Sequence, residues 1–366
     1  MSRLSEILPR RLDLPLLLSA LALTGGGLAM VYSTTLGTAR SPLFVRQLLF
    51  AFAGVVFATI LVAIDYRRLL QASPGLVAAS LLVLLWLPVF GTRIAGAKSW
   101  LKLGAGLHVQ PSELAKIPVA LLIALILEKD DRPYLSGRTI GLLCAAVGLP
   151  VVLILAQPDL GVALTFGPFL AAALFFGGLR ARWWAVLLVA GALATGGSWF
   201  LLKEYQRDRI RTFLDPDLAA RGAGYQVRQA KIAIGSGGPL GKGFTKGSQS
   251  RLGFLPVRHT DFIFAALAEE WGFAGVAATL SLYGLLLSRG LAIARDARDR
   301  GGAMLALLLS TDLVVQALVN AAMNAGVLPT TGITLPLVSY GGSSMLASWG
   351  MIGLCLSVAY RRYVNV

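Results

Sequence analysis

The chain has 366 residues, of which 56% are hydrophobic and 14% charged, and its formal net charge is +15. Soluble domains carry roughly 25% charged residues, so this composition excludes an ordinary water-soluble globular protein. The mean hydropathy of +0.72 and the long apolar runs indicate a polytopic helical membrane protein.

Apolar runs near the ~20 residues that a bilayer requires predict an all-α fold of ten membrane-spanning helices in one bundle. We treat residues 1–366 as a single integral membrane domain. The first run lacks a small-residue cleavage site, so we expect it to stay in the chain. The expected spans are 14–33, 44–64, 74–91, 111–128, 138–156, 160–178, 183–202, 261–288, 303–325 and 341–360.

The distribution of Lys and Arg predicts the orientation. With the N-terminus in the cytoplasm, the inner segments hold sixteen Lys and Arg residues and the short outer loops hold five. The long segment 203–260 then lies outside, before the eighth helix, although it holds eleven more. Long loops follow the positive-inside rule poorly, so we expect a multi-pass cytoplasmic-membrane protein with both termini in the cytoplasm.

The segment 203–260 is the largest extramembrane piece. Its eleven basic and four acidic residues give a net charge of +7. Val227, Ala230 and Ile234 share one face of an amphipathic helix, which favours a position on the membrane surface. The basic charge suits either anionic lipid headgroups or an anionic, phosphorylated substrate outside the cell.

Cysteine and histidine usage argues against a disulfide or a histidine-built metal centre. Cys144 and Cys355 both lie inside apolar runs, where they are typical of small buried hydrophobic residues. The only two histidines are His108 and His259, which are too few for such a metal site.

Ionisable residues at membrane depth are the first candidates for function. Glu113 and Lys116 are three residues apart, so they share a helix face and can pair. Asp159 lies in a short Gln-Pro-Asp turn, where a helix cap is the simplest interpretation. Asp261 stands at the start of the eighth span, where a charge is costly and therefore a functional candidate, although it could also serve as an N-cap.

Two further polar patterns stand out. Residues 339–344, Ser-Tyr-Gly-Gly-Ser-Ser, open the tenth helix, and free amides at a helix N-terminus can bind an anion, although the glycines also suit close packing. The ninth span carries a polar stripe spaced by four residues, which interhelical hydrogen bonds can explain. Its members are Asp312, Gln316, Asn320 and Asn324. Counting spans places Glu113, Asp159, Asp261 and Ser343 all at the outer face, where the chemistry must use a substrate that is already activated.

At this point several stretches, in the same order along the chain, resemble the SEDS family, whose branches include RodA and FtsW. The stretch 251–256, Arg-Leu-Gly-Phe-Leu-Pro, is more similar to the RodA branch. The stretches that carry the resemblance are 110–116, 157–161, 224–226, 255–264, 268–270 and 336–344.

The resemblance implies ten transmembrane helices and a peptidoglycan glycosyltransferase that polymerises lipid II during cell elongation. It implies a class B penicillin-binding protein as the partner, membrane lipids as surroundings and no nucleic-acid partner. Carried over to this chain, it makes Asp261 the catalytic residue, expected to act as a general base. The substrate-binding residues are then expected to be Glu113, Lys116, Asp159, Arg258, His259, Thr260 and Ser343.

The resemblance leaves open a divalent cation, Mg or Mn, beside the pyrophosphate, and the sequence assigns no metal ligands. This chain departs from the family pattern at Val257, where Glu is common, at Leu337, where Phe is usual, and at residues 321–322. Val257 argues against an acid acting beside Pro256.

Two other functions compete with the glycosyltransferase. A lipid II flippase would use the same cavity and cations without a base at Asp261. An ion-coupled small-molecule transporter would need sites near the membrane midplane, whereas the polar groups here gather at one face.

Overall fold

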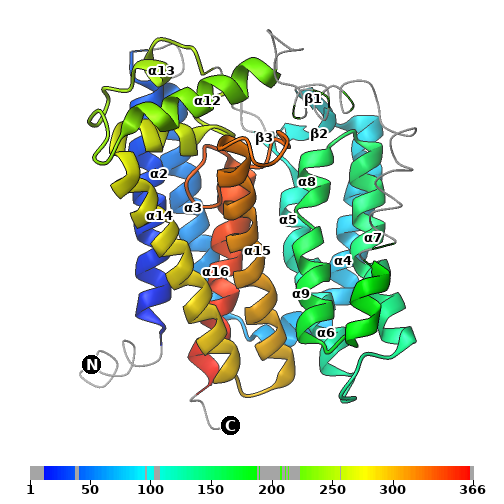
Figure 1. Ribbon diagram of the computed structural model, residues 1–366. Helices are drawn as coiled ribbons and strands as arrows, with labels where there is room; N and C mark the ends of the chain where they lie inside the picture. The colour runs from blue at the N-terminus through cyan, green and yellow to red at the C-terminus, as the bar shows by residue number, and fades with distance from the viewer. Residues whose placement is uncertain are drawn as a thin grey trace, which may run out of the picture.

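The computed structural model describes residues 12–37, 41–94, 97–102, 108–187, 223–255 and 257–362, with the single residues 189, 207, 211 and 213. Within this part of the chain, seven helices are long and apolar enough to cross a membrane. They stand side by side in one bundle (Figure 1). The expected α-helical membrane bundle is therefore confirmed, while the seventh expected span, 183–202, lies mostly outside the described residues.

The helices are α2 (Leu14–Thr35), α3 (Pro42–Ala63), α4 (Tyr66–Phe90), α5 (Pro111–Leu114), α6 (Lys116–Glu128), α7 (Gly137–Ala156), α8 (Leu160–Leu164), α9 (Gly167–Phe176), α12 (Ala223–Gly237), α13 (Ser248–Arg251), α14 (Ile263–Arg295), α15 (Arg300–Asn324) and α16 (Gly342–Arg361). The expected fourth span is divided into α5 and α6 at Ala115, and the sixth into α8 and α9. The helix expected from residue 74 begins earlier, at Tyr66, because the Asp65 side chain accepts a hydrogen bond from the amide of Arg67 and caps it.

A small antiparallel sheet follows α4. Its strands are β1 (Thr92–Ile94), β2 (Ala97–Lys102) and β3 (His108–Val109), with β2 in the centre. The sequence pattern predicted no strand in this connection. Strands of two to six residues between two apolar spans are too short to give a clear alternating pattern.

Helix α16 forms the centre of the bundle and is buried along almost its whole length. It packs against α3, α15 and α2. A Cβ atom at Gly353 would lie 2.6 Å from the Cα atom of Ala58, so the backbones of α16 and α3 approach closely there. Small residues permit such close packing between membrane helices.

Helix α14 is broken at Gly272, whose φ of 64° lies in the left-handed region. The amides of Phe273 and Ala274, just after the break, donate to the carbonyl oxygens of Gly238 and Pro239 at 2.8 and 3.0 Å. The loop that follows α12 thus packs against the break in α14. Its carbonyl oxygens accept the hydrogen bonds of the amides that have no acceptor within the interrupted helix.

Two buried carboxylates hold the next part of this loop. Glu269 accepts hydrogen bonds from the Lys242 ammonium at 2.8 Å and from the amides of Gln249 and Ser250 at 2.8 and 3.0 Å. Its neighbour Glu270 accepts from the amide of Thr245 at 3.0 Å. The basic, glycine-rich segment 238–251 is therefore tied to α14.

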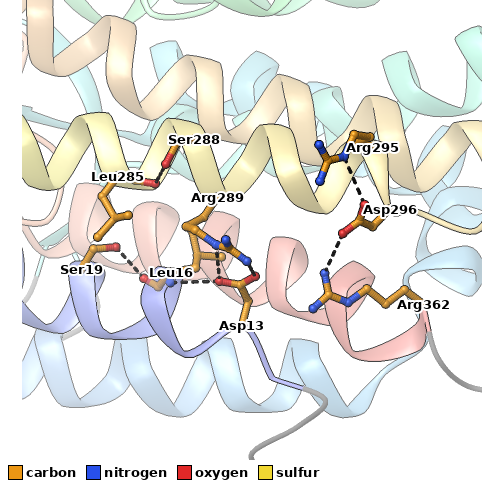
Figure 2. Close-up of polar contacts among 9 residues, drawn as sticks. All are labelled: Asp13, Leu16, Ser19, Leu285, Ser288, Arg289, Arg295, Asp296 and Arg362. Carbon is orange, nitrogen blue, oxygen red and sulfur yellow. Dashed lines mark hydrogen bonds and ion pairs between the residues drawn. The ribbon is translucent and has the colours of Figure 1, made fainter.

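Helix α12 lies across one end of the bundle, and we call this the α12 end (Figure 1). The expected amphipathic helix is confirmed there, with Ala230 buried. At the opposite end α2 begins and α16 ends. Ion pairs join the helices at that end, as Figure 2 shows: Arg289 bonds both oxygens of Asp13 at 3.0 and 2.6 Å, and Arg362 contacts Asp296 at 3.4 Å.

Candidate active site

A cavity of about 970 Å³ opens at the α12 end of the bundle. Its walls come from α3, the β1–β3 sheet, α5, α8, the segment before α14, the segment 331–334 and the start of α16. Elements that are far apart in the sequence therefore meet around one space.

Asp261 lines this cavity, in a turn that precedes α14. Its backbone carbonyl oxygen accepts hydrogen bonds from the side-chain amides of Asn320 at 3.0 Å and Asn324 at 2.9 Å. Two asparagines of the polar stripe on α15 thus fix the backbone of the candidate catalytic residue. The interhelical hydrogen bonds expected from that stripe are confirmed.

The N-cap interpretation of Asp261 is wrong. Helix α14 begins at Ile263, two residues later than expected, and its N-cap is Phe262, which makes no side-chain cap hydrogen bond. The Oδ1 atom of Asn324 instead accepts from the amide of Ala265, in the first turn, at 3.2 Å. Because the neighbouring helix supplies this cap, the carboxylate of Asp261 is not needed for it.

Glu113 and Lys116 form the expected ion pair, with 2.8 Å between Lys116 Nζ and Glu113 Oε2. Glu113 lines the cavity, whereas Lys116 is 1% exposed and lies behind the wall. The Lys116 ammonium also donates to Gln316 Oε1 at 3.1 Å.

Asp159 and Ser343 meet through Gln110. The Gln110 side chain donates to Asp159 Oδ2 at 2.6 Å, and its backbone amide donates to Ser343 Oγ at 2.7 Å. Asp159 also caps α8, because its Oδ1 atom accepts from the amide of Val162 at 3.2 Å. The predicted cap is confirmed, and the same carboxylate lines the cavity.

The segment before α16 is tied to the segment before α14. The hydroxyl of Ser339 donates to the carbonyl oxygen of Thr260 at 2.7 Å, and the amide of Tyr340 donates to that of His259 at 2.8 Å. Burial raises the pKa of Tyr340, although the neighbouring Arg46 opposes the shift. Together these two segments form one wall of the cavity.

The structure brings five of the eight sequence-predicted site residues to the cavity and leaves three behind its walls. Arg258 donates from Nε to the carbonyl oxygen of Thr34 at 2.8 Å, and the His259 ring lies 5.7 Å from that of Tyr340. Both are 9% exposed. The residues at the cavity are Glu113, Asp159, Thr260, Asp261 and Ser343, and the three others are Lys116, Arg258 and His259.

Sequence reasoning missed two cations at the cavity, Arg46 of α3 and Arg93 of β1. Both entered only the count of positive charges in the outer segments. Arg46 lies inside a helix long and apolar enough to span, and a charge there is costly, so its position alone was a usable signal.

Within the described residues, no group of three or more His, Cys, Asp or Glu side chains gathers to hold a metal ion. The donor set around the cavity therefore does not match a dedicated metal site.

Comparison with known proteins identifies relatives along almost the whole chain. The family model of FtsW, RodA and SpoVE, described as a cell cycle protein, matches residues 14–364. The peptidoglycan glycosyltransferase MrdB of Escherichia coli is 41% identical over 84% of this chain and 83% of its own length. The probable peptidoglycan glycosyltransferase FtsW of Trichlorobacter lovleyi is 37% identical over 95% of this chain and 93% of its own.

Two solved structures share the fold. A chain from a peptidoglycan synthase complex, studied for the coordination of polymerization and crosslinking, matches with a TM-score of 0.83 and 35% identity. The match covers 97% of this chain and 99% of that chain. The rod shape determining protein RodA of Thermus thermophilus matches with a TM-score of 0.71 and 33% identity, over 97% of this chain and 98% of that protein.

Proposed function

The chain belongs to the FtsW/RodA/SpoVE family, and from that premise we propose that it is a peptidoglycan glycosyltransferase that polymerises lipid II into glycan strands. The observation that carries this proposal is the cavity at the α12 end, which three carboxylate residues and two arginines line. The carboxylates belong to Glu113, Asp159 and Asp261, and the arginines are Arg46 and Arg93.

The reaction joins two sugars that are carried on polyprenyl pyrophosphates. A hydroxyl oxygen of the acceptor sugar attacks the anomeric carbon of the donor, a new C–O bond forms, and the bond to the pyrophosphate oxygen breaks. The hydroxyl proton must leave, and the departing pyrophosphate carries the additional negative charge. A base near the acceptor and positive groups near the pyrophosphate are therefore what the chemistry requires.

Asp261 is the proposed base. Its carboxylate lines the cavity while two asparagines of α15 fix its backbone, so the side chain is presented from a rigid support. Thr260, whose carbonyl oxygen is bonded to Ser339, holds the adjoining wall. Because α14 takes its cap from Asn324, the Asp261 carboxylate can accept a proton without loss of the helix start.

Arg46 and Arg93 are the proposed partners of the pyrophosphate, because they are arginines that line the cavity directly. The N-terminus of α16, with Gly342 and Ser343, lines the same space, and a helix N-terminus favours an anion. Lys116, Arg258 and His259 then act from behind the walls by supporting these surfaces.

We place the cavity at the extracytoplasmic face of the bacterial inner membrane, with both chain termini in the cytoplasm. The positive-inside count supports this orientation, and the carrier-linked substrate suits it because nucleotide donors are confined to the cytoplasm. The similarity to a chain of a synthase complex supports a class B penicillin-binding protein as the crosslinking partner. The similarity to the rod shape determining protein RodA supports a role in cell elongation.

The relatives named glycosyltransferases do not favour the flippase alternative. The deciding experiment is polymerisation of purified lipid II by the purified chain together with its transpeptidase. Glycan strands resolved by gel electrophoresis are the expected product, made at a rate that depends on Asp261. Lipid II transport across a vesicle membrane without any polymer would overturn the proposal.

A further inference from the structure

A buried aspartate lies near the middle of α15, beneath the cavity. Asp312 is 0% exposed and belongs to a membrane-spanning helix, where a carboxylate is costly unless something holds it. Asp312 does not line the cavity. Its Oδ1 atom has no hydrogen-bond partner among the described residues, so burial of this side chain is not explained by a fully satisfied packing site.

A continuous chain of polar contacts leads from Asp312 to the cavity wall. The side-chain amide of Gln316, one helical turn further along α15, donates to Asp312 Oδ2. The Oε1 atom of Gln316 accepts from Lys116 Nζ at 3.1 Å, and the same ammonium pairs with Glu113 at 2.8 Å. Of the four residues in this series of polar contacts, Glu113 is the one that lines the cavity.

Only one orientation of the Gln316 amide satisfies both neighbours. The ammonium of Lys116 can only donate, so the amide oxygen of Gln316 must face it, and the amide nitrogen then donates to the Asp312 carboxyl oxygen Oδ2. If the Gln316 amide were reversed, its NH2 group would face the Lys116 ammonium and its oxygen would face the Asp312 carboxyl oxygen, so neither hydrogen bond would form. Gln316 therefore couples the position of Lys116 to the carboxyl group of Asp312.

We propose that Asp312 and Gln316 are positioning residues that fix Lys116, and through it Glu113, at the wall of the active site. The inference rests on the proposed function, because Glu113 is taken to belong to the substrate cavity. Glu113 alone would leave the Lys116 side chain several rotamers. A second acceptor from α15 restricts it, and the carboxylate behind that acceptor strengthens the hold because hydrogen bonds in a chain polarise one another.

The arrangement allows a swap experiment. Asp312→Asn retains an oxygen that can accept from Gln316, so we expect a loss in kcat of about threefold or less. Gln316→Glu places two carboxylates side by side and removes the donor, so kcat should fall about 10- to 30-fold. In the double variant, Asp312→Asn with Gln316→Glu, the introduced asparagine amide donates to the introduced glutamate, which in turn accepts from Lys116. The rate constant kcat should then return to within about threefold of the parent.

The readouts are kcat and KM for lipid II polymerisation by the full chain with its transpeptidase, and the thermal unfolding of each purified variant. A positioning role lowers kcat with KM within about twofold. Ser310→Ala is the matched control, because this α15 hydroxyl bonds only to its own helix at Ala306 and Leu307, and its rate should stay at the parental value.

Packing alone predicts a different pattern, because Asn and Glu are nearly isosteric with the residues that they replace. A parental rate for Gln316→Glu, or a double variant no faster than Gln316→Glu, would overturn the proposal. If the parent chain itself makes no polymer, the proposed function is refuted, but the proposed positioning of Lys116 by Asp312 and Gln316 is not. In that case the unfolding temperatures of the variants should follow the order expected for kcat. A double variant no more stable than Gln316→Glu would still refute the positioning role of Asp312 and Gln316.

Discussion

Asn324 of α15 and Asp261 are joined by a hydrogen bond of 2.9 Å from the asparagine side-chain amide to the aspartate backbone carbonyl. The same asparagine caps α14 through its Oδ1 atom, which accepts from the amide of Ala265. One side chain thus fixes both the proposed base and the start of the helix that follows it. The residue whose backbone is held in this way lines the cavity.

Removal of this side chain should reduce activity and stability together. Asn324→Ala leaves the Ala265 amide without its cap and takes one of two donors from the Asp261 carbonyl. An unsatisfied buried group costs about 1–3 kcal/mol, so we expect lower thermal stability and a polymerisation rate reduced about tenfold. Thr279→Val is the control, since its hydroxyl bonds only within α14, to Gly275. An unchanged rate in Asn324→Ala would contradict the positioning role.

Glu269 should control the order of the basic segment 238–251. Glu269→Gln keeps the shape but loses the ion pair with Lys242 and sets an amide group near the amides of Gln249 and Ser250. Loss of about 1.4 kcal/mol of local stability would raise cleavage by trypsin at Lys246 and Arg251 about tenfold. Asp296→Asn, at the opposite end of the bundle, should be cleaved there at the parental rate. Equal cleavage in the two variants would show that Glu269 does not hold the segment.

The sequence predicted the spans well because a bilayer imposes a long apolar run on every helix that crosses it. It predicted the pairing of Glu113 with Lys116 because residues three apart share a helix face. It could not predict that Arg258 and His259 do not line the cavity, because both residues lie in an irregular turn, where spacing does not determine the direction of a side chain. It could not predict that Arg46 and Arg93 line the cavity, because only the fold brings α3 and the sheet to the same space.

The cap of α14 shows the same limit. An Asp at the start of a predicted helix is a reasonable N-cap from sequence. The structure assigns that task to Asn324, which is 63 residues away from Asp261 in the chain, so no local pattern could reveal it. Contacts between distant elements, rather than local propensity, determine the geometry of this site.

Glu113 and Lys116 should behave as a coupled pair. Lys116→Met should lose much of the polymerisation rate, because it leaves the Glu113 carboxylate without its 2.8 Å partner. In the double variant Glu113→Gln with Lys116→Met no charge is left unpaired between the two positions. We therefore expect its loss to be smaller than the sum of the two single losses by about 1 kcal/mol or more. Strict additivity of the rate effects would show that the two residues act separately.

The orientation can be tested by thiol labelling. In a chain with Cys144→Ala and Cys355→Ala, a cysteine at the exposed position Lys246 should react with a membrane-impermeant reagent in intact spheroplasts. A cysteine at Arg298, exposed at the other end of the bundle, should react only after lysis. The reverse pattern would place the cavity in the cytoplasm and remove the argument for a carrier-linked substrate.

Asp261→Asn separates catalysis from structure. Asn has nearly the same shape, and the backbone carbonyl that Asn320 and Asn324 hold is unchanged, so the fold and the partner complex should persist. Loss of a general base lowers rates about 100-fold or more, and we expect the purified variant to polymerise lipid II that much more slowly. Thermal unfolding and co-purification with the transpeptidase verify that the variant is intact. Glycan chains made at a near-parental rate would refute Asp261 as the base and would return the flippase to consideration.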